Sequence, residues 1–205
     1  MSGQKIRETY LEAGEFFGRV VDQVDIDGWD SPALGEWCVR DLTGHTYRSF
    51  TTVLSYSAKP GDKVDLERPV DYFLKALDSL ADPKQMAERG RAAGLEIIDD
   101  PKMMVRGFGM YVKNKLEELS DDHIMATPVG GIRLIDYLPT RTFELIIHTM
   151  DLAIALGAND EPPESGLEAT IQILGQLALH RGHAPSLILA ATGRHVLSEG
   201  FSVIG

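Results

Sequence analysis

Cysteine is nearly absent from the chain, and this limits both its cross-links and its metal chemistry. The single cysteine, Cys38, cannot form an intramolecular disulfide, which is typical of a protein from a reducing compartment. A zinc cluster built from several thiolates is excluded for the same reason. If the protein binds a metal ion, the ligands must come from histidine, aspartate or glutamate.

Basic residues are scarce as well. The sequence holds 20 Lys and Arg against 31 Asp and Glu, which gives a formal net charge of -11, and the basic residues form no cluster. Such a chain repels a phosphate backbone. We therefore expect no nucleic-acid partner.

Long apolar runs are missing too. No run approaches the roughly 20 residues that cross a bilayer, so we expect no membrane partner. The first residues lead into Glu8, Glu12 and Glu15 rather than into the apolar core of a secretory signal. We expect a cytoplasmic protein, and the sequence leaves open whether it forms a homodimer.

Helical periodicity dominates what remains. With 205 residues, 43% hydrophobic and 25% charged, the chain is long enough for one sizeable core. Apolar residues recur at helical spacing between capping residues, prolines and glycines. The helices expected from this pattern cover residues 4–24, 39–57, 70–80, 83–98, 102–119, 140–156 and 167–180, with a shorter apolar run at 186–192.

Extended structure is expected in few places. Residues 127–134 predict a hairpin whose two pieces flank a Gly130-Gly131 turn. Residues 201–204 predict one further extended piece near the C-terminal end. Residues 25–37 predict a loop anchored by Trp29 and Trp37. The sequence therefore predicts a mainly α protein.

Two expected helices carry a narrow row of polar side chains on an otherwise apolar surface. The row on residues 140–156 spans roughly 80° and consists of Arg141, Glu144, His148 and Asp151. The row on residues 39–57 consists of Asp41, His45, Arg48 and Thr52. If the rows face each other in a bundle, His45 meets Glu144 and His148 and fills three of four tetrahedral positions of a zinc site.

The same spacing is also typical of ordinary solvated helix faces. Arg141 with Glu144, and His148 with Asp151, would then be i,i+3 pairs worth about 0.2–0.5 kcal/mol each. Spacing alone favours this second interpretation, because Glu-x-x-x-His is common by chance.

Two segments shift the balance. WCVRDLTGH at residues 37–45 and RTFELIIHTMDL at residues 141–152 resemble the mycothiol-dependent maleylpyruvate isomerase family, within the wider DinB-like group. The resemblance covers most of residues 5–157. It implies a DinB-like four-helix bundle over residues 1–157 with additional helices, and a short C-terminal α/β extension over residues 158–205 packed on the bundle. It also implies zinc, or another divalent metal, held by His45, Glu144 and His148.

The resemblance further implies an enzyme of the isomerase or S-transferase type, in which mycothiol as thiol cosubstrate adds to a small electrophile. The tail is shorter than the C-terminal domain of the isomerase, so one named substrate is not implied. We expect Arg48 and Arg141 to hold an acidic electrophile, and Asp151 either to accept a proton from His148 or to form a surface ion pair. Arg194, in a tail that also looks like family endings, is the candidate for cofactor binding.

Two other functions stay open at this point. One is a binding module without catalysis that keeps the bundle and the metal. The other is a metal-dependent hydrolase, which needs a general base that the sequence does not nominate.

Overall fold

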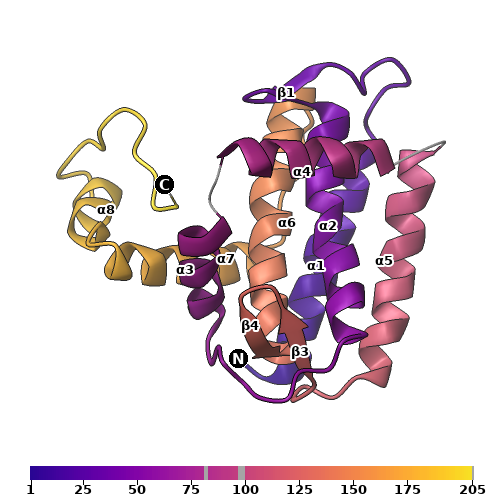
Figure 1. The fold of residues 1–205 in the computed structure, drawn as a ribbon. Helices are drawn as coiled ribbons and strands as arrows, with labels where there is room; N and C mark the ends of the chain where they lie inside the picture. Colours follow the sequence, from indigo (N-terminus) through magenta and orange to yellow (C-terminus); the bar gives the residue numbers. More distant parts are fainter. Residues whose placement is uncertain (81–82, 97–99, 205) are drawn as a thin grey trace.

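The computed structural model describes residues 1–80, 83–96 and 100–204, and this part of the chain is mainly helical (Figure 1). Its helices are α1 (Gly3–Val21), α2 (Val39–Ser57), α3 (Pro69–Leu80), α4 (Pro83–Glu96), α5 (Pro101–Glu118), α6 (Leu134–Leu156), α7 (Glu164–His180) and α8 (Ala184–Ala191). Its strands are β1 (Pro32–Leu34), β2 (Trp37–Cys38), β3 (Ile124–Thr127) and β4 (Gly130–Arg133). The mainly α fold expected from the sequence is confirmed. None of the described helices combines the length with the apolar composition that a bilayer crossing demands.

Four helices, α1, α2, α5 and α6, stand side by side as a bundle (Figure 1). Arg7, near the start of α1, donates to the carbonyl of Leu119 at the end of α5, so these two helices are antiparallel. The carbonyl of Ser57, the last residue of α2, lies 2.9 Å from Nε2 of His123, which follows the end of α5, so α2 and α5 run the same way. The directions along the chain are therefore up, down, down, up.

The bundle is held together by an apolar core to which α1 contributes one face. Phe16 and Phe17 are fully buried, and burial of one such side chain stabilises the fold by about 1.5–3 kcal/mol. Tyr10 lies in the same core, where its hydroxyl donates to the carbonyl of Ser49 at 3.0 Å and its ring meets Phe50 edge-on. This bond satisfies a polar group that would otherwise be buried without a partner.

The helix that carries Glu144 begins earlier than the sequence indicated. We expected it over residues 140–156, but α6 starts at Leu134 and runs through Pro139. Proline removes one backbone donor from a helix interior. The helix continues because Leu134, Tyr137 and Leu138 on this turn are all fully buried. Its end is as expected, since Gly157 adopts a left-handed φ of 63° after the last turn.

The hairpin is present but its turn is displaced. Thr127 pairs with Gly130, so residues 128 and 129 form the turn and Gly130-Gly131 belong to β4. A Cβ atom on Gly131 would collide with the carbonyl oxygen of Lys63, so this glycine permits a close approach of two backbones. In the expected loop over residues 25–37, the structure adds the small β1–β2 hairpin.

The C-terminal extension is helical rather than α/β, which corrects our expectation. Helix α7 packs on α3 and α6 through a second apolar cluster, formed by Val70, Phe73, Phe143, Ile173, Leu177, Ala178 and Val203. In the described part of the tail, the segment expected to be extended pairs with no strand. The guanidinium of Arg181 donates instead to the carbonyl of Ile204 at 2.7 Å. Both sheets lie at the ends of the bundle, away from this segment (Figure 1).

The remaining boundaries agree with the sequence to within a few residues, and α2 covers the expected range of 39–57. Residues 97 and 98, which we included in the helix over 83–98, lie outside the described residues. The division of the chain at residue 157 stays a prediction.

Candidate metal centre

Helices α2 and α6 turn their polar rows toward each other, so His45, Glu144 and His148 meet. Nε2 of His45 lies 3.7 Å from Oε2 of Glu144, and Nε2 of His148 lies 3.4 Å from the same oxygen. The two imidazole rings are perpendicular, with centroids 4.7 Å apart. One potential ligand atom from each residue lies within 4.8 Å of the others.

Local sequence explains how His45 is positioned. The backbone N–H of Cys38 donates to Oδ2 of Asp41 at 3.2 Å, which caps the first turn of α2. On the next turn, Gly44 contacts the backbone of α4 where that helix crosses α2, and any side chain there would collide with Gly94. The indole of Trp37 covers the imidazole of His45, with ring centroids 4.7 Å apart.

The donor set and its spacing fit a zinc ion. Two ligands bound at about 2.0–2.1 Å to a tetrahedral zinc lie roughly 3.3 Å apart, close to the 3.4 and 3.7 Å that separate the Glu144 oxygen from the two imidazole nitrogens. Two imidazoles and one carboxylate suit this borderline ion. The three side chains stay 16–21% exposed, so a fourth ligand can reach the centre from solvent.

A carboxylate behind one ligand fixes the orientation of its ring. Nδ1 of His148 forms a hydrogen bond with Oδ2 of Asp151 at 3.1 Å. Because a carboxylate only accepts, this nitrogen carries the proton and Nε2 is left to bind a metal. Nδ1 of His45 is buried and has no hydrogen-bond partner among the residues that the structure describes. Asp151 thus belongs to the site as a positioning residue, where the sequence had left a surface pair open.

The charges of the three ligands are set before any cation binds. Burial raises the pKa of Glu144, but hydrogen bonds from His148 and His45 and the charge of Arg141 hold it well below its usual value. Burial lowers the pKa of His148, yet hydrogen bonds with Asp151 and Glu144 bring it up to about 9. Burial lowers the pKa of His45. At neutral pH the centre therefore holds a carboxylate, an imidazolium and a neutral imidazole.

Arg141 belongs to the same polar row of α6 as Glu144 and His148, and it is buried in the protein interior. The residue is only 8% exposed, and its guanidinium lies over the rings of Tyr137 and Tyr72, at 4.9 and 5.2 Å from their centroids. Its Nε donates to the hydroxyl of Thr140 at 3.0 Å. Stacking on two rings stabilises the cation without neutralising it. The remaining N–H groups of its fork suit a carboxylate.

Arg48 lies one turn beyond His45 on α2 and is half-buried. Its backbone carbonyl accepts from the hydroxyl of Thr52 at 2.7 Å, and its guanidinium forms no ion pair with another described residue. The positive charge of Arg48 acts on one of the ligands, because it contributes to lowering the pKa of His45. The structure thus brings both expected arginines, Arg48 and Arg141, to the border of the centre.

Arg194 is not brought to the centre. It follows α8, is exposed, and its guanidinium donates to the carbonyl of Thr192 at 3.1 Å. Helix α8 lies on the far side of α7 from α2 (Figure 1). Cofactor binding by Arg194 at this centre therefore has no support from its position.

Three residues of the site, Tyr72, Tyr137 and Trp37, were not singled out from the sequence as site residues. Tyr72 comes from α3, which carries none of the expected ligands. Helices α3 and α6 are far apart in the sequence and come into contact only in the folded chain. Trp37 was recognised as a loop anchor, but not as the cover of His45. Its place at the start of the WCVRDLTGH segment was the available signal.

Comparisons with protein-family models, with curated proteins and with solved structures found no match to this chain. The family resemblance consequently rests on the two sequence segments alone and stays a prediction.

Proposed function

We propose that the protein is a zinc-dependent enzyme of the mycothiol-dependent maleylpyruvate isomerase type, built on a DinB-like bundle, that adds a small thiol to an acidic electrophile. The observation that carries the proposal is the meeting of His45, Glu144 and His148 from two helices at zinc-ligand spacing. The up, down, down, up bundle and the two arginines beside the ligands support it.

His45, Glu144 and His148 would hold the ion, and Asp151 keeps the imidazole of His148 turned toward it. When bound, zinc supplies a positive charge that lowers the pKa of a thiol, so that a thiolate is available near neutral pH. Burial of the ligands restricts water around the reacting sulfur, because each of the three side chains is at least three-quarters covered.

The arginines determine which electrophile reacts. Arg141 offers the outer N–H groups of its fork to a carboxylate, and the rings of Tyr72 and Tyr137 hold that fork in place. Arg48 faces the same border from α2. A substrate held there presents its double bond to the sulfur. Holding the two reacting groups in position in this way accelerates the reaction.

The chemical step balances without an oxidant or reductant. The thiolate sulfur forms a bond to the electrophilic carbon, and the electron pair of the C=C bond moves into the adjacent carbonyl as an enolate. In an isomerisation, rotation then occurs about the former C=C bond, which is single in the adduct. The enolate restores the C=C bond, the S–C bond breaks and the thiolate is released. In a transfer, the enolate takes one proton from solvent and the thioether stays as product.

Metal analysis of purified protein tests the proposal. We expect about one zinc per chain, strongly reduced zinc in His45→Ala and His148→Ala, and unchanged zinc in His195→Ala, which replaces an exposed histidine of the tail. Assays with mycothiol and maleylpyruvate, which carries both a carboxylate and the conjugated double bond that the step requires, should then show turnover that depends on the zinc content. Full zinc content in His45→Ala would reject the site. Thiol binding without product would instead support the non-catalytic binding module.

A further inference from the structure

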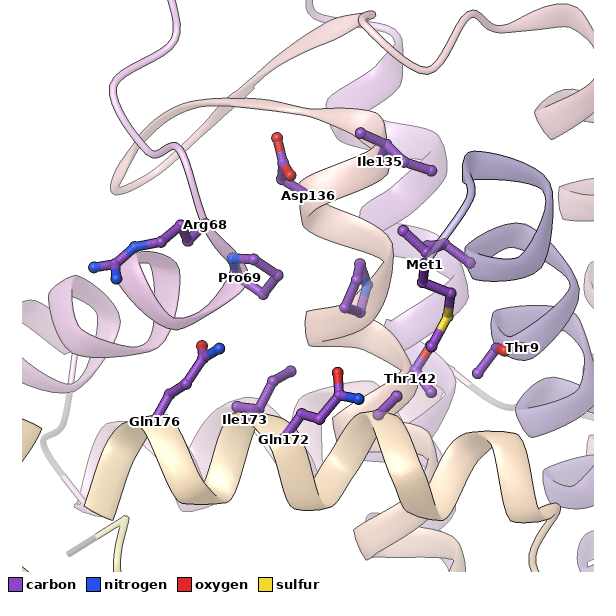
Figure 2. Close-up of a pocket in the computed structure, with 13 residues that line it drawn as sticks. Met1, Thr9, Arg68, Pro69, Ile135, Asp136, Thr142, Gln172, Ile173 and Gln176 are labelled. Atoms are coloured by element: carbon purple, nitrogen blue, oxygen red, sulfur yellow. The ribbon is translucent and has the colours of Figure 1, made fainter. Parts of the chain in front are cut away.

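A cavity lies on the opposite side of α6 from the metal ligands. It has a volume of about 250 Å³ and lies between the start of α1, the start of α3, the first half of α6 and α7 (Figure 2). At 100° per residue, Pro139 is rotated by roughly 140–180° from Glu144 and His148 around the helix. The cavity and the metal centre are therefore separate sites on one helix.

The two charged side chains at this cavity, Arg68 and Asp136, are paired with neighbours. The guanidinium of Arg68 donates to both carboxylate oxygens of Asp71, at 2.7 and 3.2 Å. The carboxylate of Asp136 accepts from Nε of Arg133 at 2.6 Å. A charged ligand would have to compete with these partners, so the cavity favours an uncharged one.

The other polar side chains of the lining are neutral, and one of them is deeply buried. The residue Thr9 is 2% exposed, and its hydroxyl has no hydrogen-bond partner within the described chain. Pro139 has no N–H, so the carbonyl of Ile135 lacks the donor that an ordinary helix residue would supply. Both Ile135 and Pro139 line the cavity.

Two carboxamides complete the lining on α7. Gln172 and Gln176 lie one turn apart and rise from α7 on the side of the cavity (Figure 2). Gln172 already donates one N–H to the carboxylate of Glu168 at 3.1 Å, which leaves its second N–H and its oxygen. Gln176 offers a donor and an acceptor, and together these groups complement an amide. Ile173 stands between them, and with Ile6 it supplies apolar wall.

We propose that this cavity binds a small uncharged amide, that is, a carboxamide or lactam carried on an apolar ring or chain. The amide group pairs with the carboxamides of Gln172 and Gln176. A further polar atom of the ligand, or a water molecule beside a ligand as small as benzamide, meets Thr9 and the carbonyl of Ile135 at depth. The volume corresponds to about eight waters at roughly 30 Å³ each, which matches a compound the size of benzamide. In this arrangement the C-terminal extension serves to close the cavity against the bundle.

Benzamide and benzoate form a matched pair of probes, because they share a shape and differ in charge. The test is a titration of the full-length, zinc-loaded protein followed by isoleucine methyl NMR. We expect benzamide to shift the methyl signals of Ile6, Ile135 and Ile173 with saturation in the millimolar range, as is usual for a ligand of this size. The signal of Ile188, on α8, serves as the distant reference. Benzoate should act on the three cavity signals at least about tenfold more weakly.

Substitutions separate the cavity from other binding places. Gln176→Leu keeps the size of the side chain but removes its amide, and should weaken benzamide binding about threefold to tenfold. Gln23→Leu replaces a glutamine at the other end of α1 and should leave binding unchanged. Equal affinity for benzoate at the cavity signals, no saturable shift, or full affinity in Gln176→Leu would each overturn the proposal. None of these results bears on zinc binding.

Discussion

Asp151 provides a sensitive test of the metal centre, because it touches the ligand His148 and would not touch the metal itself. The substitution Asp151→Asn keeps the size of the side chain but removes the charge that holds the Nδ1 proton, across a bond of 3.1 Å. Loss of such a partner typically weakens metal affinity 10–100-fold. At about 1.36 kcal/mol per factor of ten, this is roughly 1.4–2.7 kcal/mol of binding free energy.

The assay is competition for zinc against a chromophoric chelator at pH 7. A second readout is the pKa of His148 in the metal-free protein, measured by NMR, which should fall from about 9 because the hydrogen bond with Asp151 raises it. Asp160→Asn is the matched control, since Asp160 pairs with Arg19 beyond the end of the same helix. Unchanged zinc affinity together with an unchanged pKa of His148 would refute the role given to Asp151.

The remaining predictions concern pH, packing and substrate. Zinc binding at pH 7 should release about one proton, because His148 binds the metal in its neutral form whereas its pKa is about 9 without metal. The apparent zinc affinity should therefore rise roughly tenfold per pH unit from pH 7 to 9. Calorimetry in buffers of different ionisation enthalpy measures the proton release, and a binding enthalpy that does not depend on the buffer would contradict the prediction. Gly44→Ala should lower the free energy of unfolding by about 1–3 kcal/mol, because its new methyl group meets the α4 backbone. Gly18→Ala, in open space on α1, should raise it by about 0.5–1 kcal/mol in the same denaturant titration, and equal effects would refute the packing account. Arg48→Met and Arg141→Met should raise KM for an acidic electrophile at least about tenfold at unchanged zinc content, whereas an unchanged KM would remove both residues from substrate binding.

Much of the bundle could be predicted because helix formation leaves a local pattern. Apolar spacing and a capping aspartate define α2, whose expected and observed ranges coincide. The polar rows of α2 and α6 could be found in the same way, because residues three and four apart share a helix face. Their meeting across the bundle is not a local property, and only the structure shows that His45 lies beside Glu144.

The features that escaped prediction depend on contacts between distant segments. We expected this helix to begin at residue 140, directly after Pro139, yet α6 continues through the proline because buried neighbours hold the turn. Gly131 looked like a turn residue, whereas it allows the backbone at Lys63 to approach. Tyr72 gave no signal at all, since its contact with Arg141 arises only when α3 packs on α6.

The central claim is that residues of α2 and α6 hold one zinc ion between them. Anomalous diffraction from crystals grown with zinc, with data collected on both sides of the zinc absorption edge, tests it most directly. We predict a single strong peak bonded to Nε2 of His45, Nε2 of His148 and the carboxylate of Glu144. A peak held by other side chains, or no peak among these three in zinc-saturated crystals, would contradict the account.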